Sequence, residues 1–277
     1  MDKNLLRRQI AAFLTEDIGR GDLTSESIFG ANEMGSARLV AREEFVVAGI
    51  GVAKEVFALQ NSDIVCSETV AEATKVAAGD VVLEVSGPVV DLLKAERVAL
   101  NLLQRMCGIA TLTSRFVEAV AGLPVRITDT RKTTPGLRMM EKHAVQVGGG
   151  SNHRFNLTDG VLIKDNHIAA CGSITEAVKR VREKAPHTIK IEVETDTLDQ
   201  VEECLVCGAD IIMLDNMSPK MMAEAVGKID GRALVEASGG VNLETVRAIA
   251  ESGVDIVSVG ALTHSAPSCD IGMDWLD

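Results

Sequence analysis

The chain opens on two different hydrophobic patterns. Residues 1–14 place apolar side chains at helical spacing, whereas residues 36–85 contain short runs rich in Val, Ala and Ile that Gly and Asp interrupt, as strands and turns require. Two long helical stretches come next, 89–107 and 109–120, with Gly108 between them. This part of the chain therefore predicts an α+β unit and two helices that connect it to the C-terminal half.

From Pro124 onward, apolar strand patterns alternate with helical ones. The predicted strands are 125–128, 160–163, 189–193, 211–214, 233–235 and 256–259. Such alternation indicates parallel strands joined by crossover helices. Six units are too few for an eight-stranded barrel of about 250 residues. We predict a six-stranded, barrel-like α/β domain, and a doubly wound open sheet is the alternative.

Composition excludes several classes of protein. A hydrophobic share of 46% disfavours disorder, while a net charge of −12 with only 3% aromatic residues disfavours nucleic-acid binding. No apolar run approaches the roughly 20 residues of a membrane span, and the N-terminus lacks the apolar core of a signal peptide. The six cysteines are scattered in a chain that is too large to need disulfides. We therefore expect a cytoplasmic protein that binds neither nucleic acid nor membrane.

Polar or small residues follow every predicted barrel strand. These strand ends are Asp129–Thr134, Lys164–His167, Glu192–Glu194, Asp215–Asn216, Glu236–Gly240 and Gly260–Ala261. The carboxyl ends of parallel strands meet at one edge of an α/β domain, where active sites form. The sequence thus predicts a single pocket lined by cations, carboxylates and two small-residue turns.

Two of these strand ends suit phosphate. Ser238, Gly239 and Gly240 lead toward a helical pattern, so that backbone N–H groups and the helix dipole face a bound ligand. Gly260 closes the next strand, and paired turns after the last two strands form the usual phosphate site of a barrel. We therefore expect a phosphate cradle here.

Glu194 and Asp215 end successive strands and are candidate metal ligands. Carboxylate oxygens suit Mg²⁺, with substrate phosphates completing the coordination shell. Ordinary salt bridges to Lys or Arg are the alternative.

A glycine-rich segment lies before the second predicted strand. The glycines at 148–150 precede His153 and Arg154, which predicts either a flexible loop that presents a cation to the site or a simple helix stop.

The charge of the chain is unevenly distributed. Residues 126–167 contain seven Lys or Arg and four Asp or Glu, a net charge of +3, so the remainder carries −15. Guanidinium and ammonium groups match carboxylates and phosphates. The local excess therefore predicts a small polyanionic ligand inside an acidic protein.

At these residues the sequence closely resembles the quinolinate phosphoribosyltransferases, which are type II phosphoribosyltransferases. The matching stretches run nearly end to end, and long strings such as Asp129–Gly136 make the resemblance specific. The resemblance implies an N-terminal α/β sandwich with a connecting helix over 1–108 and an incomplete, TIM-like barrel over 109–277. The extreme C-terminus returning to the first domain is a further option.

The resemblance also implies an activity. Quinolinate and phosphoribosyl pyrophosphate give nicotinate mononucleotide, pyrophosphate and CO₂ with Mg²⁺, in NAD biosynthesis. The implied minimal unit is a homodimer in which Arg105 reaches the neighbouring subunit's site, and a hexamer built from three such dimers is an option.

The resemblance assigns site residues by position. The implied quinolinate-binding residues are Arg105, Arg131, His153, Arg154 and Lys164. Those for the phosphoribosyl group and its metal are Lys132, Thr133, Glu194 and Asp215. Those for the 5′-phosphate are Ser238, Gly239, Gly240, Ser258, Val259 and Gly260. Of all these, the candidates for catalysis are Lys132, Lys164, Glu194 and Asp215.

Three other functions compete with this interpretation. A related transferase could act on another heterocycle without decarboxylation, but the cation set Arg105, Arg131, Arg154 and Lys164 suits a dicarboxylate. A Schiff-base lyase would use Lys164. A phosphoribosyl-ligand sensor would bind without turnover, which the strand-end carboxylates and lysines argue against.

Overall fold

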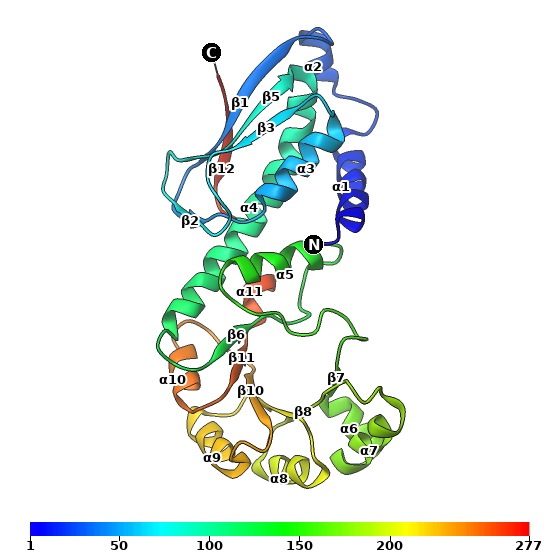
Figure 1. The fold of residues 1–277 in the computed structure, drawn as a ribbon, viewed down its shortest axis with the longest axis vertical. Helices are drawn as coiled ribbons and strands as arrows, with labels where there is room; N and C mark the ends of the chain where they lie inside the picture. Colours follow the sequence, from blue (N-terminus) through cyan, green and yellow to red (C-terminus); the bar gives the residue numbers. More distant parts are fainter. Residues whose placement is uncertain (277) are drawn as a thin grey trace. The chain divides into compact units, whose positions relative to one another are not determined.

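The computed structural model describes residues 1–276 and divides the chain into two compact units (Figure 1). The N-terminal unit comprises residues 1–114, 134–149 and 266–277, and the barrel unit comprises residues 115–133 and 150–265. Neither unit is continuous in sequence. Residues 134–149 and the C-terminal segment thus group with the N-terminal residues rather than with the barrel.

An antiparallel sheet with strand order β12-β1-β5-β3 forms the centre of the N-terminal unit (Figure 1). Its strands are β1 (Met34–Ala41), β3 (Val65–Glu68), β5 (Val81–Pro88) and β12 (Ile271–Trp275). The last strand pairs with β1 from Ala37↔Trp275 to Ala41↔Ile271, so the end of the chain completes the sheet of its beginning. A separate two-stranded ribbon pairs β2 (Phe45–Val46) with β4 (Lys75–Val76).

Helices complete the N-terminal unit. They include α1 (Lys3–Ile18), α2 (Leu23–Ile28), α3 (Ile50–Gln60) and α5 (Arg138–Val147). Asp2 caps α1 by accepting the N–H of Leu5 at 2.7 Å. The apolar positions predicted for residues 1–14 form the buried face of this helix, at Leu6, Ile10 and Leu14, and α1 packs against α3.

The prediction of two helices on either side of Gly108 was wrong. A single helix, α4 (Val89–Ala119), runs through this position without a break. Gly108 is instead a point of close packing, because an added Cβ would lie 1.8 Å from the backbone oxygen of Pro267. The glycine here makes room for a neighbouring backbone and does not end the helix.

Gly108→Ala is therefore expected to destabilise the chain. The methyl group has to displace backbone and not a flexible side chain, and overpacking of this kind costs about 1–3 kcal/mol. Gly51→Ala on α3 is the matched control, because no described heavy atom lies within 4 Å of its added Cβ, and we expect it to be neutral or stabilising by up to about 1 kcal/mol. Urea unfolding of both variants measures the difference, and equal stabilities would contradict the packing explanation.

The barrel unit contains the six expected strands in parallel (Figure 1). They are β6 (Arg126–Thr128), β7 (Val161–Ile163), β8 (Ile191–Thr195), β9 (Ile211–Asp215), β10 (Leu234–Ser238) and β11 (Ile256–Ser258). Their order, β6-β11-β10-β9-β8-β7, pairs the first strand with the last. In a doubly wound sheet the order would reverse near the middle. The six-stranded, incomplete barrel is therefore confirmed, and its ladder is open between β6 and β7.

Helices connect these strands. They are α6 (Asp165–Cys171), α7 (Ile174–Lys184), α8 (Leu198–Cys207), α9 (Pro219–Ile229), α10 (Val246–Glu251) and α11 (Ala261–His264). Each of α7, α8 and α9 is preceded by an N-cap Ser or Thr whose hydroxyl accepts a backbone N–H of the first turn. In the range 1–276, no helix is both long and apolar enough to cross a membrane.

Candidate active site

A cavity of about 630 Å³ opens at the carboxyl ends of the barrel strands. Residues from the ends of all six strands line it. They include Thr130, Arg131, Lys132, His153, Arg154, Lys164, Glu194, Asp215, Ser238, Gly239, Gly240, Ser258, Gly260 and His264. The strand-end argument thus placed most of the predicted residues around one pocket. Among the described residues, three predicted ones lie outside this lining: Thr133, Val259 and, in the N-terminal unit, Arg105.

Two backbone segments meet beside this cavity through Asp129. This carboxylate is fully buried just after β6, and it accepts the side-chain amide of Asn152 at 2.6 Å and the backbone N–H of His153 at 2.9 Å. Asp129 therefore fixes the segment that carries His153 and Arg154 into the wall. Since α5 ends at Val147 with Gly148 as its C-cap, the glycine-rich stretch stops a helix and also leads into the segment that carries His153 and Arg154.

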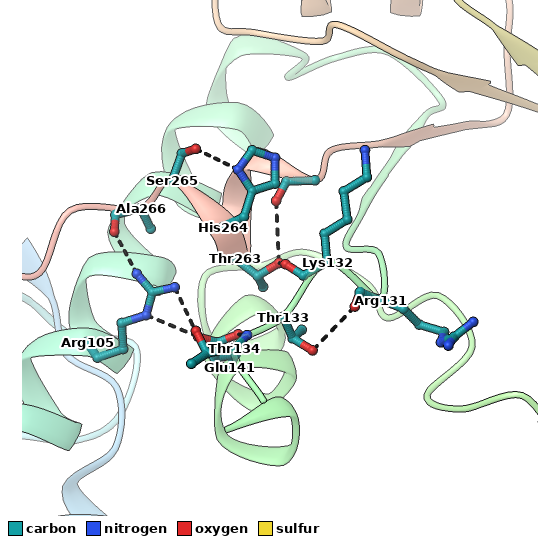
Figure 2. A network of polar contacts seen from close by, with 11 residues as sticks. Arg105, Arg131, Lys132, Thr133, Thr134, Glu141, Thr263, His264, Ser265 and Ala266 are labelled. Carbon is teal, nitrogen blue, oxygen red and sulfur yellow. Dashed lines mark hydrogen bonds and ion pairs between the residues drawn. The ribbon is translucent and has the colours of Figure 1, made fainter. Parts of the chain in front are cut away.

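The segment after Asp129 is held at a second point. The hydroxyl of Thr263 in α11 donates to the backbone oxygen of Lys132 at 2.8 Å (Figure 2). Lys132 is exposed, and its aliphatic chain contacts the turn after β11, since a Cβ added to Gly260 would lie 3.0 Å from Lys132 Cδ. The lysine and the small-residue turn therefore form adjacent parts of one wall.

The turn after β10 is built for close approach of backbone. Gly239 and Gly240 have positive φ angles of 89° and 61°, and the neighbouring Asn216, after β9, has a φ of 54°. An added Cβ at Gly239 would lie 2.2 Å from Asn216 Oδ1. The expected helix does not follow directly, because Asn242 and Thr245 form a turn first and α10 begins only at Val246. The phosphate cradle expected from the sequence would thus consist of backbone N–H groups in turns and not of a helix N-terminus.

Glu194 and Asp215 end neighbouring strands and face the same cavity. Lys164 Nζ lies 2.8 Å from Glu194 Oε2, and Asp215 Oδ2 accepts the side-chain amide of Asn216 at 2.6 Å. The salt bridge anticipated as the alternative is therefore present at Glu194. An all-oxygen donor set of two carboxylates beside open cavity space also fits the ligand preference of Mg²⁺.

Deeper in the barrel than Glu194, His153 contacts two buried acids. Its Nδ1 accepts the backbone N–H of Arg154 at 2.7 Å, while its Nε2 lies 3.2 Å from Glu192 Oε2 and 3.5 Å from Glu236 Oε1. Both glutamates are buried. Burial and the adjacent Glu192 raise the pKa of Glu236 to about 7.

Sequence comparison identifies the family. A sequence model of the quinolinate phosphoribosyl transferase C-terminal domain matches residues 109–274, and one of the N-terminal domain matches residues 22–107. The chain belongs to the quinolinate phosphoribosyltransferase family. The resemblance inferred from the sequence is thereby confirmed.

Relatives match this family member over nearly its whole length. A probable nicotinate-nucleotide pyrophosphorylase (carboxylating) of Bacillus subtilis (strain 168) is 47% identical over 97% of this chain and 93% of its own. A nicotinate-nucleotide pyrophosphorylase (carboxylating) of Mycobacterium leprae (strain TN) is 42% identical over 97% of this chain and 96% of its own. The crystal structure of NadC from Streptococcus pyogenes superposes with a TM-score of 0.95 at 41% identity, covering 100% of this chain and 99% of that one.

The raised pKa of Glu236 gives this family member a pH-dependent stability. Between pH 4.5 and about pH 7 the folded chain retains a proton that the unfolded chain releases, so this group lowers stability as pH rises through that window. Glu236→Gln removes the titration, and its stability relative to the wild type is expected to increase by about 2–3 kcal/mol across the window. Urea unfolding at both pH values measures this, with the exposed Glu244→Gln as control. A constant difference would refute it.

Sequence reasoning missed His264 and Glu236 in the cavity wall and Glu192, which contacts His153 beneath it. His264 was given no role, yet it lies at the end of α11 beside Ser265 (Figure 2) and lines the cavity. Glu192 and Glu236 were named only as parts of strand ends. The signal that reveals them is alternation along a strand, which places Glu192 on the same face as Glu194, and Glu236 on the same face as Ser238.

Proposed function

We propose that this family member transfers the phosphoribosyl group of phosphoribosyl pyrophosphate to quinolinate, with loss of CO₂. The products are nicotinate mononucleotide and pyrophosphate, and the reaction belongs to NAD biosynthesis. The observation that carries the proposal is one cavity in which Arg131, Arg154 and Lys164 face a glycine turn and two carboxylates. Such a cavity matches a dicarboxylate on one side and a phosphorylated sugar on the other.

The cations bind the pyridine dicarboxylate. Arg131 and Arg154 supply planar guanidinium groups for its carboxylates, and Lys164 supplies a point charge. Burial and the nearby Arg131 lower the pKa of Arg154, so an incoming dianion relieves the repulsion between these two cations. His153 contributes a ring edge to the wall, because both of its nitrogens have protein partners.

The sugar phosphate occupies the opposite wall. Backbone N–H groups around Ser238, Gly239 and Gly260 hold the 5′-phosphate, and Lys132 lies beside them. Glu194 and Asp215 are the proposed Mg²⁺ ligands. When bound, the metal supplies positive charge that stabilises the departing pyrophosphate. The two carboxylates also favour the positive charge that develops on the sugar as its bond to pyrophosphate breaks.

The chain's own contribution is positioning and electrostatic stabilisation. The bond between the anomeric carbon and pyrophosphate breaks as the ring nitrogen forms a bond to that carbon. The nitrogen is then cationic, so that when the adjacent carbon loses its carboxylate as CO₂ the electron pair stays on a ring stabilised by that charge. A proton from Lys132, Lys164 or water completes the product. Lys164, which is held by Glu194, keeps a cation beside both steps.

Substrate choice tests the proposed function. The purified protein should form a mononucleotide from quinolinate and phosphoribosyl pyrophosphate. It should turn over nicotinate at least about 100-fold less efficiently, because nicotinate lacks the second carboxylate that the half-buried Arg131 and Arg154 bind. Product formation is followed chromatographically. Equal use of nicotinate would favour the transferase without decarboxylation, and borohydride trapping of a substrate on Lys164 would favour a lyase.

A homodimer is the proposed active unit, with Arg105 contributed to the partner's site. Within the N-terminal unit the Arg105 guanidinium donates twice to Glu141 Oε1, at 3.1 and 3.0 Å, and once to the backbone oxygen of Ala266 at 2.7 Å (Figure 2). Glu141 is fully buried and also accepts the backbone N–H of Thr134 at 3.0 Å. These contacts set the direction of the guanidinium group. A trimer of such dimers is a further proposed assembly.

Mixing inactive subunits tests the shared site. Arg105→Ala and Lys164→Ala subunits are each expected to be inactive alone, whereas a mixed dimer contains one site with neither substitution. Random mixing at equal amounts should restore about a quarter of wild-type activity per dimer, with half of the dimers mixed and one of two sites intact. Native mass spectrometry establishes that mixed dimers formed. Mixed dimers without activity would contradict a shared site.

We place this reaction in the cytoplasm. All six cysteines, which lie within the described residues, are free thiols, and Cys107, Cys204 and Cys269 are buried. Unpaired cysteines suit a reducing compartment. The acidic charge outside the 126–167 segment supports the expectation that neither nucleic acid nor an anionic membrane is a partner.

A further inference from the structure

The interior of the barrel is polar where such barrels are usually apolar. The strands direct a layer of polar side chains into the core. It contains Glu192 and Glu236, each two residues before Glu194 and Ser238, together with Thr128 and Ser258 at the ends of their strands, and all four are buried. Burying two carboxyl groups costs free energy unless they are hydrogen-bonded or paired with other polar groups. One carboxylate oxygen on each glutamate, Oε1, has no hydrogen-bond partner among the described residues.

A second cavity lies on the other side of this layer. It has a volume of about 350 Å³ and opens at the amino ends of the strands, where Arg126, Lys190 and Ile256 line it. It shares His153, Arg154 and Glu236 with the substrate cavity, and Glu192 lines it too. The cluster of His153, Glu192 and Glu236 is therefore part of the partition between two cavities at opposite ends of the barrel.

The same three side chains have the spacing of a metal site, since one ligand atom from each lies within 4.8 Å of the others. The hydrogen bond to His153 argues for a proton instead. Because Nδ1 accepts the N–H of Arg154 at 2.7 Å, it carries no hydrogen, so in the neutral ring the hydrogen is on Nε2. That hydrogen points at the two glutamates and occupies the position that a metal would need.

We propose that Glu192 and Glu236 are positioning residues for His153 and, through it, for Arg154. Glu192 Oε2, which lies 3.2 Å from Nε2, accepts the Nε2–H, and the Glu236 carboxyl group lies beside it at 3.5 Å, so that the two acids fix the tautomer and the ring plane. The ring then holds the backbone of Arg154 through Nδ1, while Arg154 Nη1 donates to Gly160 O at 3.0 Å. Substrate affinity on the quinolinate side thus depends on two acids that lie beneath the cavity. The kinetic part of this inference rests on the proposed function.

The tautomer is tested directly by NMR. A two-bond ¹H–¹⁵N spectrum of the whole protein separates the Nε2–H, Nδ1–H and doubly protonated forms, and comparison with His153→Asn assigns one of the five histidines. We expect the Nε2–H form in the wild type and a changed form in the double variant Glu192→Leu, Glu236→Leu. The double Gln variant keeps an oxygen acceptor on each side chain and is expected to keep the wild-type form. Another form in the wild type, or no change with Leu, overturns the proposal.

Kinetics of the same variants separate positioning from a general structural role. The double Leu variant is expected to raise KM for quinolinate by about 10- to 100-fold, which is the usual effect of removing groups that support a binding residue from behind. Its KM for phosphoribosyl pyrophosphate should stay within about twofold, and the double Gln variant should recover most of the loss. Glu244→Leu, which replaces an exposed acid outside the cavity, is the control. Equal losses toward both substrates, or no recovery with Gln, would overturn positioning. If the wild type turns over neither substrate, the proposed function fails while the spectrum still decides the tautomer.

Discussion

Lys164→Ala is expected to lower kcat by about 10²- to 10³-fold, the cost of removing one charged or hydrogen-bonding group that stabilises a transition state. Lys164 lies at the end of β7, half-exposed to the substrate cavity, with Nζ 2.8 Å from Glu194 Oε2. The substitution removes the cation nearest to both proposed steps. It also leaves Glu194 without its counter-charge, beside a site that receives phosphates and carboxylates.

Matched substitutions identify the cause of that loss. Lys179→Ala removes an exposed lysine from α7 and is expected to leave kcat unchanged within about twofold. Lys164→Arg keeps the charge but replaces a compact ammonium by a planar fork, and we expect it to recover only part of the activity. Steady-state rates with both substrates saturating measure all three variants. A loss below about tenfold for Lys164→Ala would remove this lysine from the catalytic group.

Gly239→Ala is expected to raise KM for phosphoribosyl pyrophosphate by about 100-fold, which corresponds to about 2.7 kcal/mol of binding. The residue has a φ of +89°, which side chains other than glycine rarely adopt. The new methyl group would lie 2.2 Å from Asn216 Oδ1 and 2.8 Å from Asn216 N. To accept it, the turn after β10 has to move away from the turn after β9, and the backbone N–H groups proposed to bind the phosphate move with it.

Gly240→Ala is the matched control for Gly239→Ala. The two residues share the same turn, and Gly240 also has a positive φ, of +61°, but its added Cβ meets no described heavy atom within 4 Å. Its effect therefore measures backbone strain alone, and we expect it to be at most about 30-fold, since strain of this kind costs about 1–2 kcal/mol. Equal effects of the two substitutions, or a larger rise in KM for quinolinate than for phosphoribosyl pyrophosphate, would contradict the cradle.

Much of the site was predictable because parallel strands bring their carboxyl ends together. Lys164, Glu194 and Asp215 are far apart in sequence, yet knowing that each ends a strand is enough to place them around one cavity. The barrel could be predicted for a similar reason, since six repeated strand and helix patterns leave few topologies.

The polar interior of the barrel could not be predicted in this way. In β8, Glu192 and Glu194 alternate with apolar residues, and such alternation normally indicates one solvent-facing side. Here both sides are covered, and the acids face inward. The partner of the buried Glu192 carboxylate is His153, whose Nε2 lies 3.2 Å from Glu192 Oε2 and which comes from a loop 39 residues earlier in the sequence. Contacts between distant segments of this kind leave no periodic signal in the sequence.

Close packing at a glycine could not be predicted from the sequence either. Gly108 reads as a helix break because glycine is a weak helix former. Its actual constraint is the backbone oxygen of Pro267, a residue near the other end of the chain. Similarly, Arg105 is held by Glu141, 36 positions away, and by Ala266. Helix propensity describes the free-energy cost of a residue within its own helix, whereas Gly108 and Arg105 are constrained by groups from distant parts of the sequence.

Release of CO₂ from the ring is the most direct test of the central claim. Purified protein is incubated with Mg²⁺, phosphoribosyl pyrophosphate and quinolinate labelled in the carboxyl group next to the ring nitrogen, and trapped CO₂ is counted against mononucleotide formed. The account predicts one labelled CO₂ per mononucleotide and none without phosphoribosyl pyrophosphate, because the ring nitrogen must become cationic before the carboxylate leaves. Mononucleotide that retains the label, or label released without phosphoribosyl pyrophosphate, would contradict it.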